Sequence, residues 1–163
     1  MSRIDALVVE HGDAVYRLAR SVVRDPALAE DVTQDTMIRV WERLDTFRGD
    51  GSVRGWILRI AHNTAIATLR RVRDQATDPN LLPDRAEAIG VARRVEGYLA
   101  VDELDEALGR LDDISRSLVV LREVEGLSYQ EIADVLEISV PAVRTRLMRA
   151  RRVLTDVLEG WRP

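Results

Sequence analysis

The sequence predicts an all-α protein in which two small helical domains are joined by a flexible linker. Three observations favour this fold class. Apolar residues recur three and four positions apart on both sides of the chain's middle, which is the spacing that gives a helix one buried face. Capping residues and prolines stand at the ends of these periodic segments. A polar, acidic, proline-containing stretch over residues 74–84 divides the segments into two groups.

The first 73 residues predict three helices. The first helix spans approximately residues 2–24 and is closed by Asp25-Pro26. Asp25 can cap the next helix while Pro26 occupies its first position, where a missing N–H group is no loss. A glycine-containing loop over residues 46–53 then leads to a third helix over roughly 54–72.

The third helix is expected to bury one stripe and to expose a basic face. No acidic residue occurs from Gly51 through Arg73. Such a helix beside a glycine-containing loop suits a nucleic acid strand, with phosphates held by arginine and an unpaired base in a pocket. The alternatives are that Trp56 is a core residue and His62 an ordinary surface histidine. The stripe is Ile57, Ile60, Ala61, Thr64 and Leu69, and the outer face is Arg54, Arg59, His62, Asn63, Ala67, Arg70 and Arg71.

Residues 127–155 predict a short capped helix, a tight turn and a second helix. Ser128 and Glu131 form a capping-box pattern at the start of the first helix. Ser139 is a good N-cap for the second helix, with Pro141 in its first turn. This is the plan of a helix-turn-helix, whose second helix enters the major groove of DNA. The apolar faces are Tyr129, Ile132, Ala133 and Leu136 in the first helix and Val143, Leu147, Ala150 and Leu154 in the second.

The outer side of this second helix is basic. Between Ile138 and Thr155 there are five arginines and no acidic residue. A solvated surface helix is the alternative, but such faces usually mix both signs of charge to gain pairs four residues apart. We therefore favour a DNA-binding helix. Its turn is not ideal, because Glu137 stands where a glycine would most easily supply positive φ.

The net charge of −4 is unusual for a DNA-binding protein. The distribution of charged residues along the chain resolves this conflict. Residues 1–73 hold 12 arginines against 10 acidic residues, whereas residues 74–111 hold 4 against 9. Residues 112–163 hold 8 against 9. The negative charge is concentrated in the middle of the chain, and the local footprint matters more than the total.

The composition excludes several classes of protein. The 163 residues include no cysteine, which excludes disulfides and suits a reducing cytoplasm. No stretch approaches the roughly 20 apolar residues that span a bilayer, and we expect no signal peptide. Phosphate-loop, nucleophile-elbow and metalloprotease motifs are missing, and His11 and His62 have no partners at ligand spacing. We expect no enzyme activity, no cofactor and no metal.

Taken together, the segments resemble the extracytoplasmic-function (ECF, group IV) sigma factors of the sigma-70 family, the small initiation subunits of bacterial RNA polymerase. The resemblance covers nearly all of the chain outside the linker, and two long motifs in this order are specific. It implies a region 2-like domain over residues 1–73, an acidic linker over 74–98 and a region 4-like domain over 99–163. The matching stretches are 29–41, 47–49, 54–63 and 69–71 in the first domain, and 121–129 with the helix-turn-helix in the second.

The resemblance also implies roles for three groups of residues. Asp31, Gln34, Asp35 and Arg39 look like the surface that docks on the clamp helices of the polymerase. A second group looks like the surface that binds the −10 element, captures an unpaired base and stabilises melted DNA. Its members are Arg48, Gly49, Ser52, Arg54, Arg59, His62, Asn63, Arg70 and Arg71. A third group looks like the surface that binds the −35 element: Ser139, Pro141, Ala142, Arg144, Thr145, Arg146 and Arg149. Within the first group, a helix laced by the Asp35–Arg39 pair is an alternative, and both can hold.

The partners implied by the resemblance are core RNA polymerase, through its clamp helices and flap, promoter DNA, and an anti-sigma factor. We expect no membrane insertion and no small-molecule substrate. A further hypothesis is that the acidic linker folds towards the basic helices and quiets the free protein. Four positions depart from the family's usual pattern. Val53 and Ala67 bear on the preference for the −10 sequence, whereas Asp112 and Glu137 bear on local stability.

Two rival hypotheses remain at this point. The first is a stand-alone helix-turn-helix regulator, which would normally dimerise on a two-fold site. The second is a protein-interaction module whose arginines meet an acidic partner.

Overall fold

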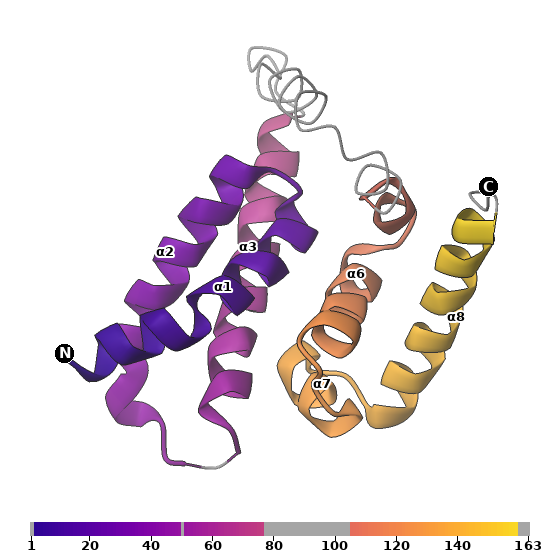
Figure 1. The fold of residues 1–163 in the computed structure, drawn as a ribbon. Coiled ribbons are helices and arrows are strands. Elements are labelled where there is room, and N and C mark those ends of the chain that lie inside the picture. The colour runs from indigo at the N-terminus through magenta and orange to yellow at the C-terminus, as the bar shows by residue number, and fades with distance from the viewer. Residues whose placement is uncertain (1, 50, 77–104, 160–163) are drawn as a thin grey trace.

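The chain folds into two groups of helices that lie side by side (Figure 1). The computed structural model describes residues 2–49, 51–76 and 105–159. The first domain contains α1 (Arg3–Val23), α2 (Pro26–Arg43), the 3-10 turn η1 (Leu44–Thr46) and α3 (Val53–Ala76). The second contains a short helix over 105–109, α6 (Asp113–Val119), the π-helical segment η2 (Val120–Val124), α7 (Tyr129–Leu136) and α8 (Val140–Glu159). No strand occurs in these described ranges, and the all-α prediction is confirmed.

Capping side chains fix where the helices of the first domain begin. Ser2 and Asp5 form a capping box on α1, in which the Ser2 Oγ accepts from the Asp5 N–H at 3.3 Å. The Asp25 carboxylate accepts from the Ala27 N–H at 2.8 Å, with Pro26 directly after the cap. The predicted starts of α1 and α2 are therefore confirmed. The third helix runs to Ala76, beyond its predicted end.

In the second domain, side-chain caps again set the helix starts. The Asp112 carboxylate accepts from the Ser115 N–H at 2.8 Å, so that α6 begins without the proline usual at this position. The capping box of Ser128 and Glu131 on α7 is confirmed, with both of its hydrogen bonds formed. Between these helices, η2 ends where the Glu125 N–H donates to the Val120 carbonyl at 3.0 Å.

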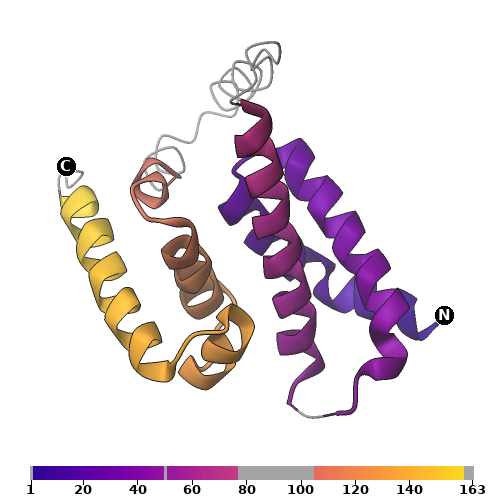
Figure 2. The ribbon, with the colours of Figure 1, turned by 180° about the vertical axis from the view of Figure 1, so that it is seen from behind.

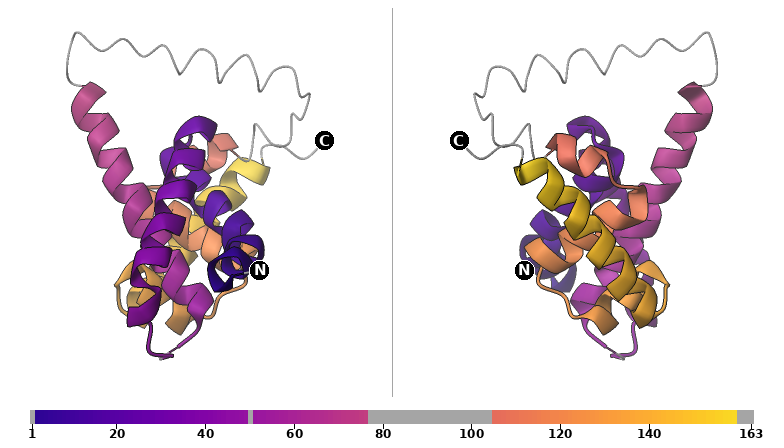
Figure 3. Two further views of the ribbon diagram at one scale, coloured as in Figure 1. Left: turned by 90° about the vertical axis from the view of Figure 1, so that its left-hand side faces the viewer. Right: turned by 90° about the vertical axis from the view of Figure 1, so that its right-hand side faces the viewer.

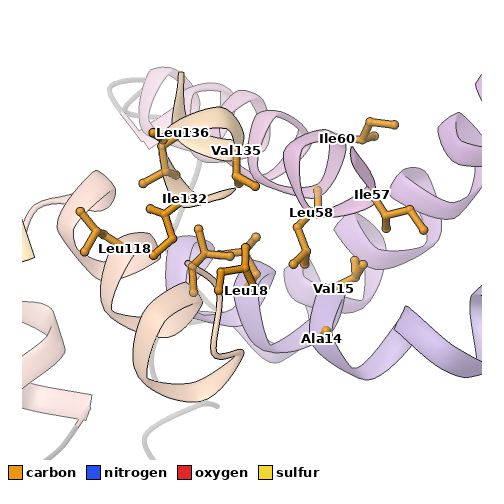
Figure 4. Packing of buried hydrophobic residues seen from close by; sticks show 14 of the residues in the cluster. Ala14, Val15, Leu18, Ile57, Leu58, Ile60, Leu118, Ile132, Val135 and Leu136 are labelled. Atoms are coloured by element: carbon orange, nitrogen blue, oxygen red, sulfur yellow. The ribbon is translucent and has the colours of Figure 1, made fainter. Parts of the chain in front are cut away.

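One apolar cluster joins the two domains, as the close view shows (Figure 4). Leu18 of α1 and Leu58 of α3 share it with Leu118 of α6 and Ile132 of α7, and all four are at most 1% exposed. Burying one such side chain contributes about 1.5–3 kcal/mol relative to leaving it in water. The domains are therefore held together by a common core, which the sequence did not predict.

A buried arginine adds a polar contact between the domains. Arg116 of α6 donates to the Ser21 carbonyl at 2.9 Å and to the Val22 carbonyl at 3.4 Å, at the end of α1. Asp113 accepts from the same guanidinium at 2.6 Å. Carbonyl groups at a helix C-terminus lack partners within the helix, so Arg116 satisfies groups that burial would otherwise leave unpaired.

Helix α3 lies at the boundary between the two domains, and α8 lies on the outer side of the second domain. Figure 2 shows α3 between α2 and the second domain. The helix α8 lies on the side of the second domain that faces away from α1–α3, and the right-hand view of Figure 3 looks onto it. Most of the predicted linker lies outside the described residues, so the boundaries 1–73, 74–98 and 99–163 stay a prediction.

Candidate nucleic-acid and polymerase interface

The helix-turn-helix forms as its sequence predicts. Glu137 ends α7 with φ of 58°, the left-handed conformation expected of the turn. The Ser139 Oγ accepts from the Ala142 N–H at 3.2 Å and so caps α8. Val143 and Leu147 bury one side of α8, at 1% exposure or less. The turn and the apolar stripe together direct the opposite side of α8 into solvent.

All seven residues proposed for the −35 element are at least partly accessible to solvent. Five of them border a groove of about 660 Å³ between the start of α6 and α8: Pro141, Ala142, Thr145, Arg146 and Arg149. Helix α8 lies on the side of the second domain that faces away from α1–α3, so the first domain does not pack against it (Figure 3). The exposed members are Ser139, Pro141, Arg144, Thr145 and Arg149, and the half-buried ones are Ala142 and Arg146.

Guanidinium groups on α8 and on the neighbouring η2 contact aromatic or acidic side chains. The guanidinium carbon of Arg122 lies 4.7 Å from the centre of the Tyr129 ring, and that of Arg144 lies 6.0 Å from it. Arg151 donates to Glu123 at 2.6 Å. This contact raises the pKa of Arg151, so that its charge is retained.

The loop before α3 and one edge of α3 form the second candidate surface. The loop turns through Gly49 and Gly51, both at φ of 82°. The Ser52 Oγ then accepts from the Gly55 N–H at 2.9 Å, at the start of α3. Trp56 is half buried and stacks at a tilt on Phe47, with ring centres 5.2 Å apart. Exposed here are Arg48, Gly49, Ser52, Arg59, Asn63, Arg70 and Arg71, with Arg54 half buried.

The predicted exposure of His62 is wrong, because the second domain covers it. His62 is 6% exposed, and its Nδ1 has no hydrogen-bond partner in the structure. Burial lowers its pKa to about 4, although the charges of Glu137 and Asp113 act in the opposite direction. The imidazole is therefore neutral near pH 7. The proposed DNA contact of His62 requires that the second domain be displaced.

Two other members of this surface are paired with the second domain. Arg54 donates to Glu125 at 2.7 Å, and Arg59 pairs with Glu137. Burial raises the pKa of the Glu125 carboxyl, but hydrogen bonds from Arg17 and Arg54 outweigh burial and leave this pKa below its ordinary value. Glu125 is therefore charged near neutral pH. These acidic partners lie far from α3 in the sequence, and no sequence pattern pointed to them.

The surface proposed to bind the polymerase lies on α2. Asp31, Gln34, Asp35 and Arg39 are all exposed. No ion pair joins Asp35 to Arg39 within the part of the chain that the structure describes, so the alternative of a helix laced by this pair is not supported.

Two exposed apolar residues that were not predicted as part of this surface lie on the same side of α2. Ile38 is 52% exposed and Trp41 is 64% exposed. They continue the surface of Gln34 at helical spacing, and this spacing was the signal available in the sequence. An exposed tryptophan next to a polar rim is typical of a protein-binding surface.

The described residues offer no alternative site for a metal. No group of three or more metal-binding side chains gathers in the described ranges. No helix there is both long enough and apolar enough to cross a bilayer.

Comparison with known proteins identifies both domains. The sigma-70 region 2 family matches residues 7–75, and the sigma-70 region 4 family matches residues 102–154. RNA polymerase sigma factor CnrH of Cupriavidus metallidurans is 36% identical over 94% of this chain and 85% of its own length. ECF RNA polymerase sigma factor SigE of Mycolicibacterium smegmatis is 35% identical over 94% of this chain and 61% of its own length.

Two solved structures share the arrangement of helices. CnrH in complex with the cytosolic domain of CnrY matches with a TM-score of 0.71 at 33% identity, over 96% of this chain and 88% of that chain. The sigma factor RpoE in complex with the anti-sigma factor NepR from Bartonella quintana matches with a TM-score of 0.81, over 99% of this chain and 100% of that chain. At 21% identity, this second likeness shows the fold alone.

The fold and its basic helix-turn-helix define a two-domain DNA-binding protein. Both sigma-70 regions match in order, and relatives at 35% identity or more cover nearly the whole chain. The chain belongs to the ECF sigma factors of the sigma-70 family. It is an alternative sigma factor, which directs transcription initiation by RNA polymerase. A stand-alone regulator does not account for the region 2 match.

Proposed function

We propose that the chain directs initiation through three separate faces. The α2 face docks on core RNA polymerase, the loop and outer edge of α3 bind the −10 element, and α8 reads the −35 element. The observation that carries the proposal is the part of α8 before Thr155, which has five arginines, four of them exposed, and no acidic residue. A basic helix in this position of a helix-turn-helix is suited to the major groove.

The chemistry of each face supports its role. Arg144 or Arg146 of α8 can donate two hydrogen bonds to a guanine, the commonest specific contact with duplex DNA. Around the loop, Arg48 and Asn63 are exposed beside the Phe47–Trp56 pair, where an unpaired base has an aromatic surface nearby. Each captured and stacked base contributes about 1–3 kcal/mol to opening of the duplex. Binding free energy alone drives this opening, so the proposal includes no enzymatic step.

The proposal places the chain in the cytoplasm, where core RNA polymerase works, and includes an anti-sigma partner. The relative CnrH is known in complex with the cytosolic domain of CnrY. That complex supports a protein inhibitor for this chain too.

Run-off transcription with purified core polymerase tests the proposal. Duplexes enriched from a random promoter library serve as templates, together with the same sequences carrying a melted bubble. We expect transcripts from both templates, and only in the presence of the chain. Binding to a palindromic duplex as a dimer, without any effect on the polymerase, would instead support the stand-alone regulator.

A further inference from the structure

A small basic pocket lies between the end of α2 and the start of α3. Its volume is about 220 Å³, and both helix ends lie at the lower edge of Figure 2. The described residues that line it all belong to the first domain, and none of these is acidic. They are Arg39, Arg43, Trp56, Arg59, Ile60 and Asn63. Arg43 has no role in any of the three faces proposed above.

The two arginines of α2 lie on a different side of the helix from its exposed apolar residues. Arg39 and Arg43 are four residues apart, so they are neighbours on one edge of α2. Arg39 follows Ile38 by one residue, which turns it by about 100° around the helix axis. Arg43 is turned further still from Ile38. Helix α2 therefore has two faces, an outer one around Ile38 that we expect to meet the polymerase and a basic edge towards α3.

The charges of this basic edge have no counterpart within the described residues. Arg39 and Arg43 are both exposed, and neither forms an ion pair in the part of the chain that the structure describes. Glu42 and Asp45 are close to them in the sequence and pair with neither. Like charges four residues apart on a helix repel each other. An anion from outside the chain would relieve this repulsion.

Helix α3 completes the pocket with groups of a different chemistry. Arg59 pairs with Glu137 through one terminal nitrogen, which leaves other N–H donors of its guanidinium group for a ligand. The exposed amide of Asn63 offers both donors and an acceptor. Trp56 stacks at a tilt on Phe47, with ring centres 5.2 Å apart, and this contact holds its ring in place. Guanidinium groups suit a phosphate, whereas an amide and an aromatic ring suit a base.

The size of the pocket indicates what kind of molecule occupies it. Pockets that enclose a complete small ligand have volumes of roughly 300–1,000 Å³. At about 220 Å³, this pocket is suited to one unit of a longer chain, whose neighbouring units are held elsewhere. Arg48 is exposed on the adjoining loop and can hold such a neighbour. A single strand of DNA, with one phosphate for every base, fits this arrangement better than a free nucleotide.

We propose that Arg43, with Arg39 and Arg59, binds a backbone phosphate of single-stranded DNA whose unpaired base lies against Trp56. The inference rests on the proposed function of the loop and of α3, and it adds an edge of α2 to that surface. Helix α2 then contacts the polymerase on one face and the DNA strand on another. One rigid helix therefore sets the position of the melted strand relative to the polymerase. Arg39 lies at the border of the two faces, so Arg43 is the residue that distinguishes them.

The first test measures binding of the full chain to a fluorescein-labelled single strand from a duplex enriched in the promoter library. Arg43→Gln should lower the affinity by roughly tenfold, because it removes a charged hydrogen bond to a phosphate. The slope of log affinity against log salt should decrease by about 0.7, the value for one phosphate contact on a single strand. Arg3→Gln removes the same charge at an exposed position of α1 outside the pocket and is the matched control. Equal affinities and slopes for the two variants would overturn the inference.

A conservative variant separates the charge from the fold of the chain. Arg43→Lys keeps the charge and loses the planar fork of donors, so it should keep the salt slope and lose part of the affinity. Since Arg43 is exposed, both of its variants should melt as the unaltered chain does when followed by circular dichroism. A salt slope that falls equally in Arg43→Lys and Arg43→Gln would contradict a phosphate contact.

A second test asks whether Arg43 contacts DNA or the polymerase. Arg43→Gln should compete with a labelled chain for core polymerase as well as the unaltered chain does. Reduced competition together with unaltered binding to the single strand would assign Arg43 to the polymerase face and overturn the inference.

A third test identifies the part of the ligand that Arg43 contacts. A strand with an abasic site should bind less tightly than the complete strand, and Arg43→Gln should weaken both by the same factor. Thymidine monophosphate should displace neither strand at micromolar concentration, because it lacks the neighbouring units. Displacement from the unaltered chain but not from Arg43→Gln would make this a site for a free nucleotide and overturn the inference. Failure of the unaltered chain to initiate with core polymerase would instead reject the proposed function.

Discussion

Arg59 of α3 pairs with Glu137, the residue that ends α7 in the left-handed backbone conformation. For a residue other than glycine, this conformation costs about 1 kcal/mol. The two side chains are 51% and 54% exposed, and an ion pair at such a position contributes about 0–1 kcal/mol. The two effects are similar in size. Glu137 is therefore nearly neutral for stability and instead fixes where α3 meets α7.

Replacement of Glu137 separates these two effects. Glu137→Gly relieves the backbone and loses the ion pair, so the free energy of unfolding should stay within about 1 kcal/mol of the unaltered value. Glu137→Gln loses the pair and keeps the strain, so it should be less stable than Glu137→Gly by about 1 kcal/mol. Urea denaturation of both variants measures the difference. A Gly variant less stable than the Gln variant would show that the turn is not strained.

The burial of His62 predicts a pH dependence of stability. Its pKa is lowered from 6.5 to about 4 in the folded chain, so the unfolded chain binds more protons between these values. The free energy of unfolding should then fall with decreasing pH, by about 1.5 kcal/mol from pH 6.5 to pH 5. Glu125, whose pKa is lowered from 4.5, loses its contribution only at lower pH.

A variant that cannot titrate isolates this effect. His62→Gln should be less dependent on pH between 6.5 and 5, whatever its absolute stability. Urea titrations at several pH values give the slope for both chains, with His11 present in each. Parallel slopes would mean that His62 is not the group that responds.

Correct predictions concern residues whose partners are close in the sequence, and the wrong one concerns a residue covered by a distant part of the chain. Ser128 and Ser139 act on N–H groups three residues away, so their caps follow from local sequence alone. His62 was expected in solvent because its own helix gives no sign of the domain that covers it. The partners Arg54 and Glu125 are separated by 71 residues, and either carries its charge equally well on an open surface. Packing between domains is therefore the part that local patterns did not predict.

The proposed −35 surface makes Arg144 a test position. Arg144→Ala should weaken binding to duplexes enriched from the promoter library by about 1–3 kcal/mol if the side chain contacts a guanine. If it contacts a phosphate, the slope of log affinity against log salt should decrease by about 0.9. Anisotropy titrations at several salt concentrations distinguish the two, with Arg3→Ala as the control at an exposed arginine of α1. An unchanged affinity and slope would remove Arg144 from the interface.

The exposed tryptophan of α2 gives the corresponding test for the polymerase surface. Trp41 is 64% exposed, so Trp41→Ala removes little buried area and should leave the free energy of unfolding nearly unchanged. Tryptophan at the centre of a protein interface commonly contributes about 2 kcal/mol or more, so the affinity for core polymerase should fall by roughly thirtyfold or more. Competition against a labelled chain measures this affinity. Val9→Ala, at a position of α1 that is 76% exposed, controls for loss of surface apolar area and should compete normally. Normal competition by Trp41→Ala would show that α2 docks through its polar residues alone.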